Sequence, residues 1–405
     1  MLKNLTAVCV LAVSSATLFS AIAWAQETPG ETKKLKIISS LPLTGSANAQ
    51  TTSVINGIRM AIDEVNGKVG DYTIEYEALD DASPQRGNWD PAVEAQNANK
   101  ASRDLSVVGY IGTYNSGASK ISMPILNKAG LVMISPGNTY PGLTKPGTGE
   151  ANEPKIYRPT GKINYFRVVP TDDLQGVVAA EWAQSMGVQK VFILDDRELY
   201  GKGIADVFEK RSKELGIQVL GREGVDPKAT NFKALATKIK AVTPDLVYYG
   251  GTTQTNAGQI AKDLRTANAT PSFMVPDGCF ENAFIEAAGD ANVNGSAYIT
   301  FGGLPADQLT GRGAEFRDLY TKKYGQEPEA YAAYGYEACK VLLEAMARAK
   351  TKDRAGILQA VAETKDFEGV LGKWSFDANG DTTNKVMSGN TVENGKFKFV
   401  KVLGK

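Results

Sequence analysis

The sequence predicts an α/β protein made of two units of similar size, each with a parallel sheet covered by helices on both faces. Three observations support this prediction. The chain has 405 residues, more than one compact core usually holds. From Leu35 onward, short apolar runs alternate with longer segments of helical periodicity. A Gly/Pro-rich stretch at 142–162 interrupts the alternation, which then restarts.

The first unit contains four predicted strands and three predicted helices. Ile55, Ile58 and Ile62 form one stripe of its first helix, as expected for an amphipathic helix packed on a sheet. Pro91 begins the second helix, a position that proline favours. The strands are expected at 35–42, 72–79, 106–112 and 131–135, and the helices at 53–66, 91–104 and 121–130.

The second unit follows the Gly/Pro-rich stretch and repeats the pattern. Its first helix has Asp172 or Asp173 near the N-cap and ends at Gly187. The strands are expected at 165–170, 190–196, 218–224, 245–251 and 272–278, and the helices at 172–187, 201–216, 232–241 and 256–267.

A tail beyond Gly302 adds further elements. Helices are expected at 313–325, 330–350 and 354–363, and strand-like segments at 372–377 and 395–403 lie around a turn at 378–381. Because these elements must join the two existing units, we expect the chain to cross between the units more than once.

Residues 1–25 are expected to be a secretory signal peptide. Lys3 is followed by no charge until Glu27, and the apolar stretch between them ends in the small-x-small sequence at 23–25. An uncleaved membrane anchor is the alternative, since about 20 apolar residues can span a bilayer.

The amino-acid composition excludes several classes of function. The chain has 45 basic and 45 acidic residues, so no net charge attracts nucleic acid or an anionic membrane. It has no histidine, which excludes Ser-His-Asp and Cys-His catalytic groups and histidine-based metal sites. Beyond residue 25 only Cys279 and Cys339 remain, too few for a cysteine zinc site, and a disulfide between them is left open. No cofactor and no metal are expected.

The segment GTYNSG, Gly112–Gly117, predicts a turn that closely approaches a ligand. It begins like a phosphate-binding loop, but Ala118 and Ser119 follow where such a loop needs lysine and Ser/Thr. A single carboxylate needs less: a hydroxyl, backbone N–H groups and a helix N-terminus. Ser116 and Thr139, at the ends of neighbouring predicted strands, are the candidates, and ordinary capping or turn roles are the alternative.

Asp277 stands at the corresponding position in the second unit. Strand, glycine, polar turn, helix and a strand ending in a Pro/Gly turn occur in both units, which places the same loops at the carboxyl ends of both sheets. A carboxylate facing Ser116 and Thr139 complements a cation, and a ligand with an anion and a cation close together is an amino acid. The alternative for Asp277 is a solvated turn residue before glycine.

Motifs throughout the chain resemble those of periplasmic leucine/isoleucine/valine-binding proteins, the type I solute-binding proteins of ABC importers. SSLPLTGSANAQ, YIGTYNSGASKISMPILNKAG, DDRELYGKG, VYYGGTTQTNAGQ, FMVPDG and FEGVLGKWSFDANGD match in order. The resemblance implies two Rossmann-like lobes joined by a three-crossover hinge, with crossovers near Thr171, Gly303 and Lys385. The implied N-terminal lobe is 34–171 plus 303–385, and the C-terminal lobe is 172–302 plus 386–405.

The same resemblance implies a ligand site between the lobes. Ser116 and Thr139 meet the ligand carboxylate, and Asp277 takes the place of a longer glutamate that meets the ammonium group. Where that family has two pocket tyrosines, Gln50 and Thr252 stand here, so the pocket is more polar. The implied ligand-binding residues are Ser116, Thr139, Asp277, Tyr114, Gly137, Tyr200, Thr252, Gln50 and Tyr331.

The function implied by the resemblance is a monomeric periplasmic receptor that binds an amino acid and delivers it to a membrane permease. A ligand sensor of the same fold, and a receptor for amides, urea or aromatic acids, are the alternatives. An enzyme is not expected, because no paired acid and base are visible among Asp80, Asp81, Asp195 and Asp277.

Overall fold

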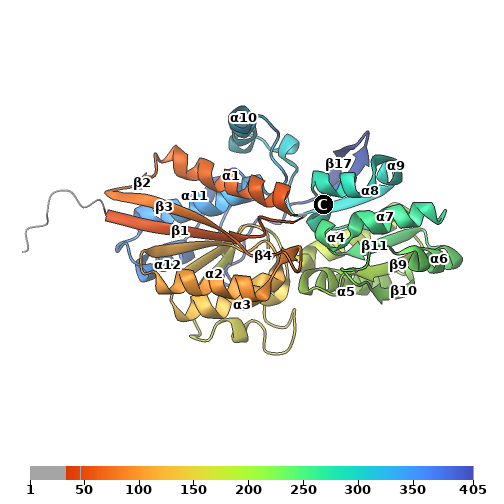
Figure 1. Ribbon diagram of the computed structural model, residues 1–405, viewed down its shortest axis with the longest axis horizontal. Helices are drawn as coiled ribbons and strands as arrows, with labels where there is room; N and C mark the ends of the chain where they lie inside the picture. Colours follow the sequence, from red (N-terminus) through yellow and green to blue (C-terminus); the bar gives the residue numbers. More distant parts are fainter. Residues whose placement is uncertain (1–32, 46, 405) are drawn as a thin grey trace, which may run out of the picture. The chain divides into compact units, whose positions relative to one another are not determined.

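Two β-sheets organise the residues that the computed structural model describes, 33–45 and 47–404 (Figure 1). The first sheet has strand order β2-β3-β1-β6-β7-β8 and is parallel except at its edge strand β2. The predicted signal peptide at 1–25 lies outside the described residues. The strands are β1 (Lys33–Leu41), β2 (Lys68–Val69), β3 (Tyr72–Asp80), β6 (Val107–Gly112), β7 (Val132–Ser135) and β8 (Tyr165–Arg167).

The second sheet has strand order β10-β9-β11-β12-β13-β16-β17. It is parallel from β10 to β13, and β16 and β17 add an antiparallel hairpin at one edge. We call the first sheet with its helices the first lobe and the second sheet with its helices the second lobe. The strands are β9 (Lys190–Asp195), β10 (Gln218–Gly224), β11 (Leu246–Gly250), β12 (Ser272–Val275), β13 (Ala297–Phe301), β16 (Met387–Glu393) and β17 (Lys396–Leu403).

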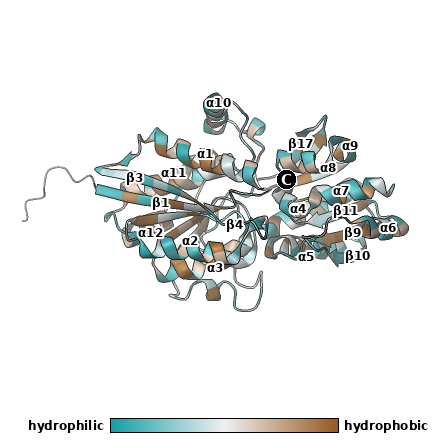
Figure 2. Cartoon of the chain, in the orientation of Figure 1, coloured by the Kyte–Doolittle hydropathy of each residue, from teal (hydrophilic) through white to brown (hydrophobic). Residues whose placement is uncertain are grey.

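Helices cover both faces of each sheet. Successive strand residues point to opposite faces, so each face carries apolar side chains that a layer of helices buries. Ile37 packs in the core cluster that includes residues of α1, α11 and α12, whereas its neighbour Ile38 packs with residues of α2 and α3. Apolar residues accordingly gather on the strands, and hydrophilic residues are numerous along the helices (Figure 2). First-lobe helices are α1 (Asn48–Glu64), α2 (Pro91–Arg103), α3 (Ser116–Lys128), α10 (Arg312–Tyr324), α11 (Ala332–Arg348) and α12 (Arg354–Ala362), and second-lobe helices are α4 (Asp172–Ser185), α5 (Leu199–Glu214), α6 (Lys233–Val242), α7 (Ala257–Thr266), α8 (Asn282–Ala288) and α9 (Asp290–Val293). No helix in these residues is long and apolar enough to cross a bilayer.

Helices α1 and α11 approach each other closely through a glycine on each helix. A Cβ added to Gly57 would come within 2.9 Å of the Tyr336 backbone nitrogen, and one added to Gly335 would come within 2.7 Å of Val54 Cγ1. Real Cβ atoms essentially never approach other heavy atoms this closely, so the packing of the two backbones requires glycine at both positions.

The chain passes between the two lobes three times: after β8, after β13 and before β16. Thr171, Gly303 and Lys385, where crossovers are expected, lie in these three connections. The sheets therefore have the type I arrangement that the resemblance implies. The residue boundaries of the two lobes stay a prediction.

Some sequence-based expectations differ from the structure. The strand expected at 165–170 belongs to the first sheet as β8, because the chain leaves this lobe only after the alternation has restarted. The segments at 372–377 and 395–403 do not flank one hairpin: β15 (Gly372–Trp374) pairs with β14 (Phe367–Gly369), and β17 pairs with β16. Cys279 and Cys339 are both buried and free, so they form no disulfide.

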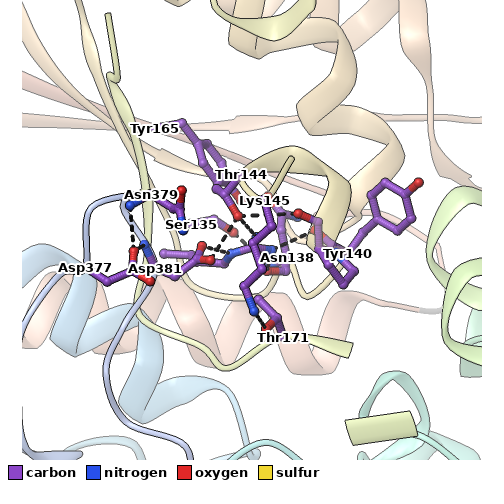
Figure 3. Close-up of polar contacts among 12 residues, drawn as sticks. Ser135, Asn138, Tyr140, Thr144, Lys145, Tyr165, Thr171, Asp377, Asn379 and Asp381 are labelled. Atoms are coloured by element: carbon purple, nitrogen blue, oxygen red, sulfur yellow. Dashed lines mark hydrogen bonds and ion pairs between the residues drawn. The ribbon is translucent and has the colours of Figure 1, made fainter. Parts of the chain in front are cut away.

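A buried arginine ties the first and third crossovers together. Arg167, at the end of β8, is fully buried and donates from Nε to Asp381 Oδ1 at 2.7 Å. Its Nη1 donates to the carbonyl oxygens of Asn138 and Tyr140 at 3.0 and 2.9 Å. Thr144 accepts from Nη2 and donates to Asp381 Oδ2 at 3.0 Å. Figure 3 shows these partners converging from the loop after β7 and the segment before β16. All three nitrogens of the guanidinium group thus donate hydrogen bonds.

We expect Arg167→Met to lower the free energy of unfolding by about 3–5 kcal/mol, because it leaves the Asp381 carboxylate buried without its partner. Urea denaturation measures the change. The matched control is Lys202→Met, which removes an exposed ion pair with Asp206 and should cost less than about 1 kcal/mol. Equal small effects of the two substitutions would contradict this role for Arg167.

Candidate ligand-binding site

A small cavity of about 20 Å³ lies where loops at the carboxyl ends of strands from both sheets meet. Ligands of open α/β sheets bind at this edge. The volume holds about one water molecule. The lining residues are Tyr114, Asn115, Ser116 and Gly137 from the first lobe and Tyr200, Thr252, Asp277 and Gly278 from the second lobe.

Ser116 contributes a hydroxyl group and the N-terminus of α3 to the first-lobe wall. Asn115, not Ser116, is the N-cap residue of this helix, and it makes no side-chain capping bond. Ser116 is buried, and its only hydrogen bond is a long one of 3.4 Å from the Tyr140 backbone nitrogen. The capping alternative for Ser116 is therefore wrong. Its hydroxyl and the positive end of a 13-residue helix are together suited to hold an anion.

Asp277 contributes a buried carboxyl group to the second-lobe wall. Its Oδ1 accepts from the Tyr200 hydroxyl at 2.7 Å, and its Oδ2 accepts from the Tyr331 hydroxyl. Burial raises the pKa of Asp277, and these two tyrosine hydroxyls partly offset the rise. Only 3% of Asp277 is exposed, so it is not the solvated turn residue of the alternative reading.

Thr139 and Asp172 lie together beside Asp277. The Asp172 backbone nitrogen donates to the Thr139 carbonyl oxygen at 2.9 Å, and the Thr139 hydroxyl has no partner. Both Asp172 carboxylate oxygens are buried without a partner. Burial, followed by the charge of Asp277, holds the pKa of Asp172 well above its usual range. A nearby cation would favour the charged form of both carboxyl groups.

The structure thus brings six of the nine predicted site residues to the cavity and places three just outside it. Tyr331 touches Asp277, and Thr139 lies beside Asp172. Gln50 does not line the cavity, because its amide accepts from the Tyr331 backbone nitrogen at 3.1 Å and donates to the Phe280 carbonyl oxygen at 3.3 Å. It bridges the two lobes instead.

Several buried polar atoms without hydrogen-bond partners belong to residues that line this cavity or lie near its lining residues. Native proteins leave few such atoms unsatisfied, so a group of them on converging loops indicates a place for a polar ligand. Within the described residues, no three acidic or cysteine side chains come together as metal ligands would. The unpartnered atoms belong to Tyr114, Asn115, Thr139, Asp172, Thr253, Gln254 and Glu281.

A family model described as periplasmic binding protein matches residues 34–396. The chain belongs to this family. It is 33% identical over 368 residues to Leu/Ile/Val-binding protein homolog 2 of Brucella abortus, which covers 88% of this chain and 91% of that protein.

Solved structures agree with this membership. The leucine-binding protein LivK from Thermotoga maritima superposes with a TM-score of 0.80 at 28% identity, covering 91% of this chain and 98% of that one. The branched-chain amino acid transporter substrate-binding protein LivJ from Streptococcus pneumoniae, solved with isoleucine, has a TM-score of 0.78 at 27% identity, covering 91% of this chain and 100% of that one. The predicted family and fold are confirmed.

Sequence reasoning missed two carboxyl groups of this binding protein. Asp172 follows the first crossover as the first residue of α4, where an acidic residue is common, and it was expected only as a cap. The N-cap is Thr171. Glu281 comes four residues after Asp277, and nothing local distinguishes it from a surface residue. Only the tertiary structure buries both carboxyl groups.

We expect Asp172→Asn to stabilise the ligand-free protein at neutral pH. A carboxyl group whose pKa is raised by folding stabilises the fold at low pH, and that stability is lost as pH rises above the unfolded value near 4. The amide stays neutral, so the free energy of unfolding should rise by at least about 1 kcal/mol at about pH 7.5 and hardly change at about pH 4. Urea denaturation at both pH values measures this.

Asp173→Asn is the matched control, one residue away. Burial raises the pKa of Asp173, but its ion pair with Lys145 at 2.8 Å and its bond from Thr171 outweigh burial, so the net shift is downward. This substitution should therefore lower stability at neutral pH by up to about 1 kcal/mol. If Asp172→Asn also lowers stability at neutral pH, the claim that the Asp172 carboxyl group destabilises the ligand-free protein is wrong.

Proposed function

We propose that this chain is the solute-binding receptor of an ABC importer and that it binds an α-amino acid between its two lobes. The single observation that carries the proposal is the pairing across one cavity of an anion-binding wall and a cation-binding wall. Ser116 and the α3 N-terminus form the first wall, and Asp277 belongs to the second, with the Asp172 carboxyl group near Asp277. An α-amino acid carries one group for each wall.

The ligand would satisfy atoms that have no partner in the closed structure. Its carboxylate would accept from Ser116 and from backbone N–H groups at the start of α3. Its ammonium group would donate to Asp277, to Asp172 and to the unpartnered Thr139 hydroxyl, so Thr139 would bind the ammonium group and not the carboxylate as the resemblance implies. Each of these bonds forms away from bulk water, where charge-assisted hydrogen bonds are strongest.

Entry of an amino acid requires the lobes to separate, because the cavity holds about one water molecule. Buried hydrogen bonds join the lobes at the site, from the Tyr331 hydroxyl to Asp277 and from Gln50 Nε2 to the Phe280 carbonyl oxygen, and more exposed contacts lie near them. Asn282 Nδ2 donates to Glu329 Oε1 at 2.8 Å, and Arg86 lies 3.3 Å from Glu198 at the rim. The exposed contacts are weak, and the buried hydrogen bonds of Tyr331 and Gln50 must break when the lobes separate on the three crossovers. Closure on a ligand restores these bonds and adds new ones.

The cellular setting follows from the family and from the N-terminal sequence. We propose that residues 1–25 direct export and are removed, and that the mature receptor is a periplasmic monomer. Its partner is then a membrane permease that receives the amino acid. The relatives named for branched-chain amino acids support this assignment.

A thermal-shift panel on residues 26–405 tests the function. The panel contains L-amino acids, matched amines and carboxylic acids that lack one charged group, urea, short amides and aromatic acids. A ligand at 100 times its Kd adds about 2.7 kcal/mol of stability. We expect shifts only with molecules that carry both charged groups. Shifts with carboxylic acids or amides alone would overturn the amino-acid assignment.

Asp277→Asn tests the ammonium-binding wall. We expect affinity for the best amino acid to fall by about 1.5–3 kcal/mol, the value of a hydrogen bond to a charged group. The control is Asp318→Asn on α10, whose side chain is 69% exposed and which should bind normally. Isothermal titration calorimetry measures both, and unchanged binding by Asp277→Asn would remove this residue from the site.

A further inference from the structure

A third buried carboxyl group, Glu281, lies next to the site in the second lobe. It immediately precedes α8 and is 1% exposed. Its Oε1 accepts from Gln254 Nε2 at 2.8 Å, whereas its Oε2 has no partner. An amino acid with one ammonium group, held by Asp277 and Asp172, would leave this carboxyl group unused.

Further unpartnered acceptors surround Glu281. Gln254 Oε1, Thr253 Oγ1 and the Tyr114 hydroxyl are all buried without a hydrogen-bond partner. Thr253 directly follows the cavity residue Thr252, and Tyr114 lines the cavity itself. After burial, the charge of Glu281 is the largest cause of the raised pKa of Tyr114, so Glu281 lies near the Tyr114 side chain. Glu281 and these atoms are therefore buried beside two residues that line the cavity, Tyr114 and Thr252.

A purely structural role does not account for Glu281. Glu337, another buried glutamate, accepts from Trp374 Nε1 at 2.6 Å and from the Val370 backbone nitrogen at 2.8 Å, so both of its oxygens have partners. Glu281 has a free oxygen, and no lysine or arginine among the described residues forms an ion pair with it. The charged residue beside it is Glu329, which is also acidic.

We propose that the site selects α-amino acids with a cationic side chain, whose terminal ammonium or guanidinium group binds Glu281 and the acceptors around it. This inference rests on the proposed function and specifies its substrate class. The side-chain end offers a carboxylate oxygen, an amide oxygen and two hydroxyl groups, which suit a group with several N–H donors. A basic amino acid carries two cations and one anion, and it would use all three buried carboxyl groups.

We also expect the binding of a ligand with a cationic side chain to release a proton. The pKa of Glu281 is raised to about 8, mainly by burial. The charge of Glu329 contributes to the rise, and the Thr253 and Gln254 side chains partly oppose it. The free site is therefore mostly protonated at neutral pH, whereas a cationic ligand favours the ionised form. The ligand side chain stays charged, with a pKa of about 10 or higher. Affinity should rise with pH up to about 8.

The first test compares ligands on the unmodified protein. Calorimetry at about pH 7.5 would compare L-lysine with L-norleucine, which lacks the ε-ammonium group, and L-arginine with its uncharged analogue L-citrulline. We expect each cationic ligand to bind at least about tenfold more tightly than its partner, with net proton release seen in buffers of different ionisation enthalpy. Equal or tighter binding of the uncharged partners overturns the inference while the proposed function stands. Binding of no α-amino acid overturns the proposed function itself.

The second test is Glu281→Gln, with Glu286→Gln on the exposed face of α8 as the matched control. Glu281→Gln should abolish the preference for lysine over norleucine and the proton release. Glu286→Gln should keep both. A retained preference in folded Glu281→Gln, verified by its thermal transition, contradicts the assignment. The ligand comparison above remains decisive if that variant does not fold.

Discussion

The buried ion pair between Arg167 and Asp381 is the interaction on which the rest of the structure depends. It joins the end of β8 to the segment before β16, at two of the three places where the chain passes between lobes. The same guanidinium group donates to the carbonyl oxygens on both sides of Thr139. The loop that carries one site residue is therefore fixed by the residues that form the hinge. A full set of partners is what makes a buried charge tolerable there.

The ligand site differs from this hinge in how well its buried polar groups are hydrogen-bonded. All three guanidinium nitrogens of Arg167 have partners, whereas around the cavity Thr139, Asp172 and Glu281 keep atoms without partners. Buried carboxyl groups without counter-charges lower stability at neutral pH, so their presence on converging loops is best explained by a ligand that completes them. The shared hinge allows the lobes to separate for that ligand and to close around it.

Much of the fold was predictable from local patterns. Strand–helix alternation located both sheets, and loops at strand ends located Ser116 and Asp277. Strand β13 was not expected, because its apolar run is only five residues long, and the sequence of β16 is too polar to indicate a strand. Asp172 and Glu281 resemble ordinary acidic residues at helix starts, and only long-range packing buries them. Gln50 was expected in the cavity wall, but packing places it where it hydrogen-bonds the second lobe.

The most direct measurement of the central claim is a crystal structure of residues 26–405 with the amino acid that binds most tightly. The account predicts that its α-carboxylate lies at Ser116 and the first N–H groups of α3, and that its α-ammonium group lies within hydrogen-bond distance of Asp277 or Asp172. A ligand bound in the reverse orientation, or outside this cavity, would contradict the account.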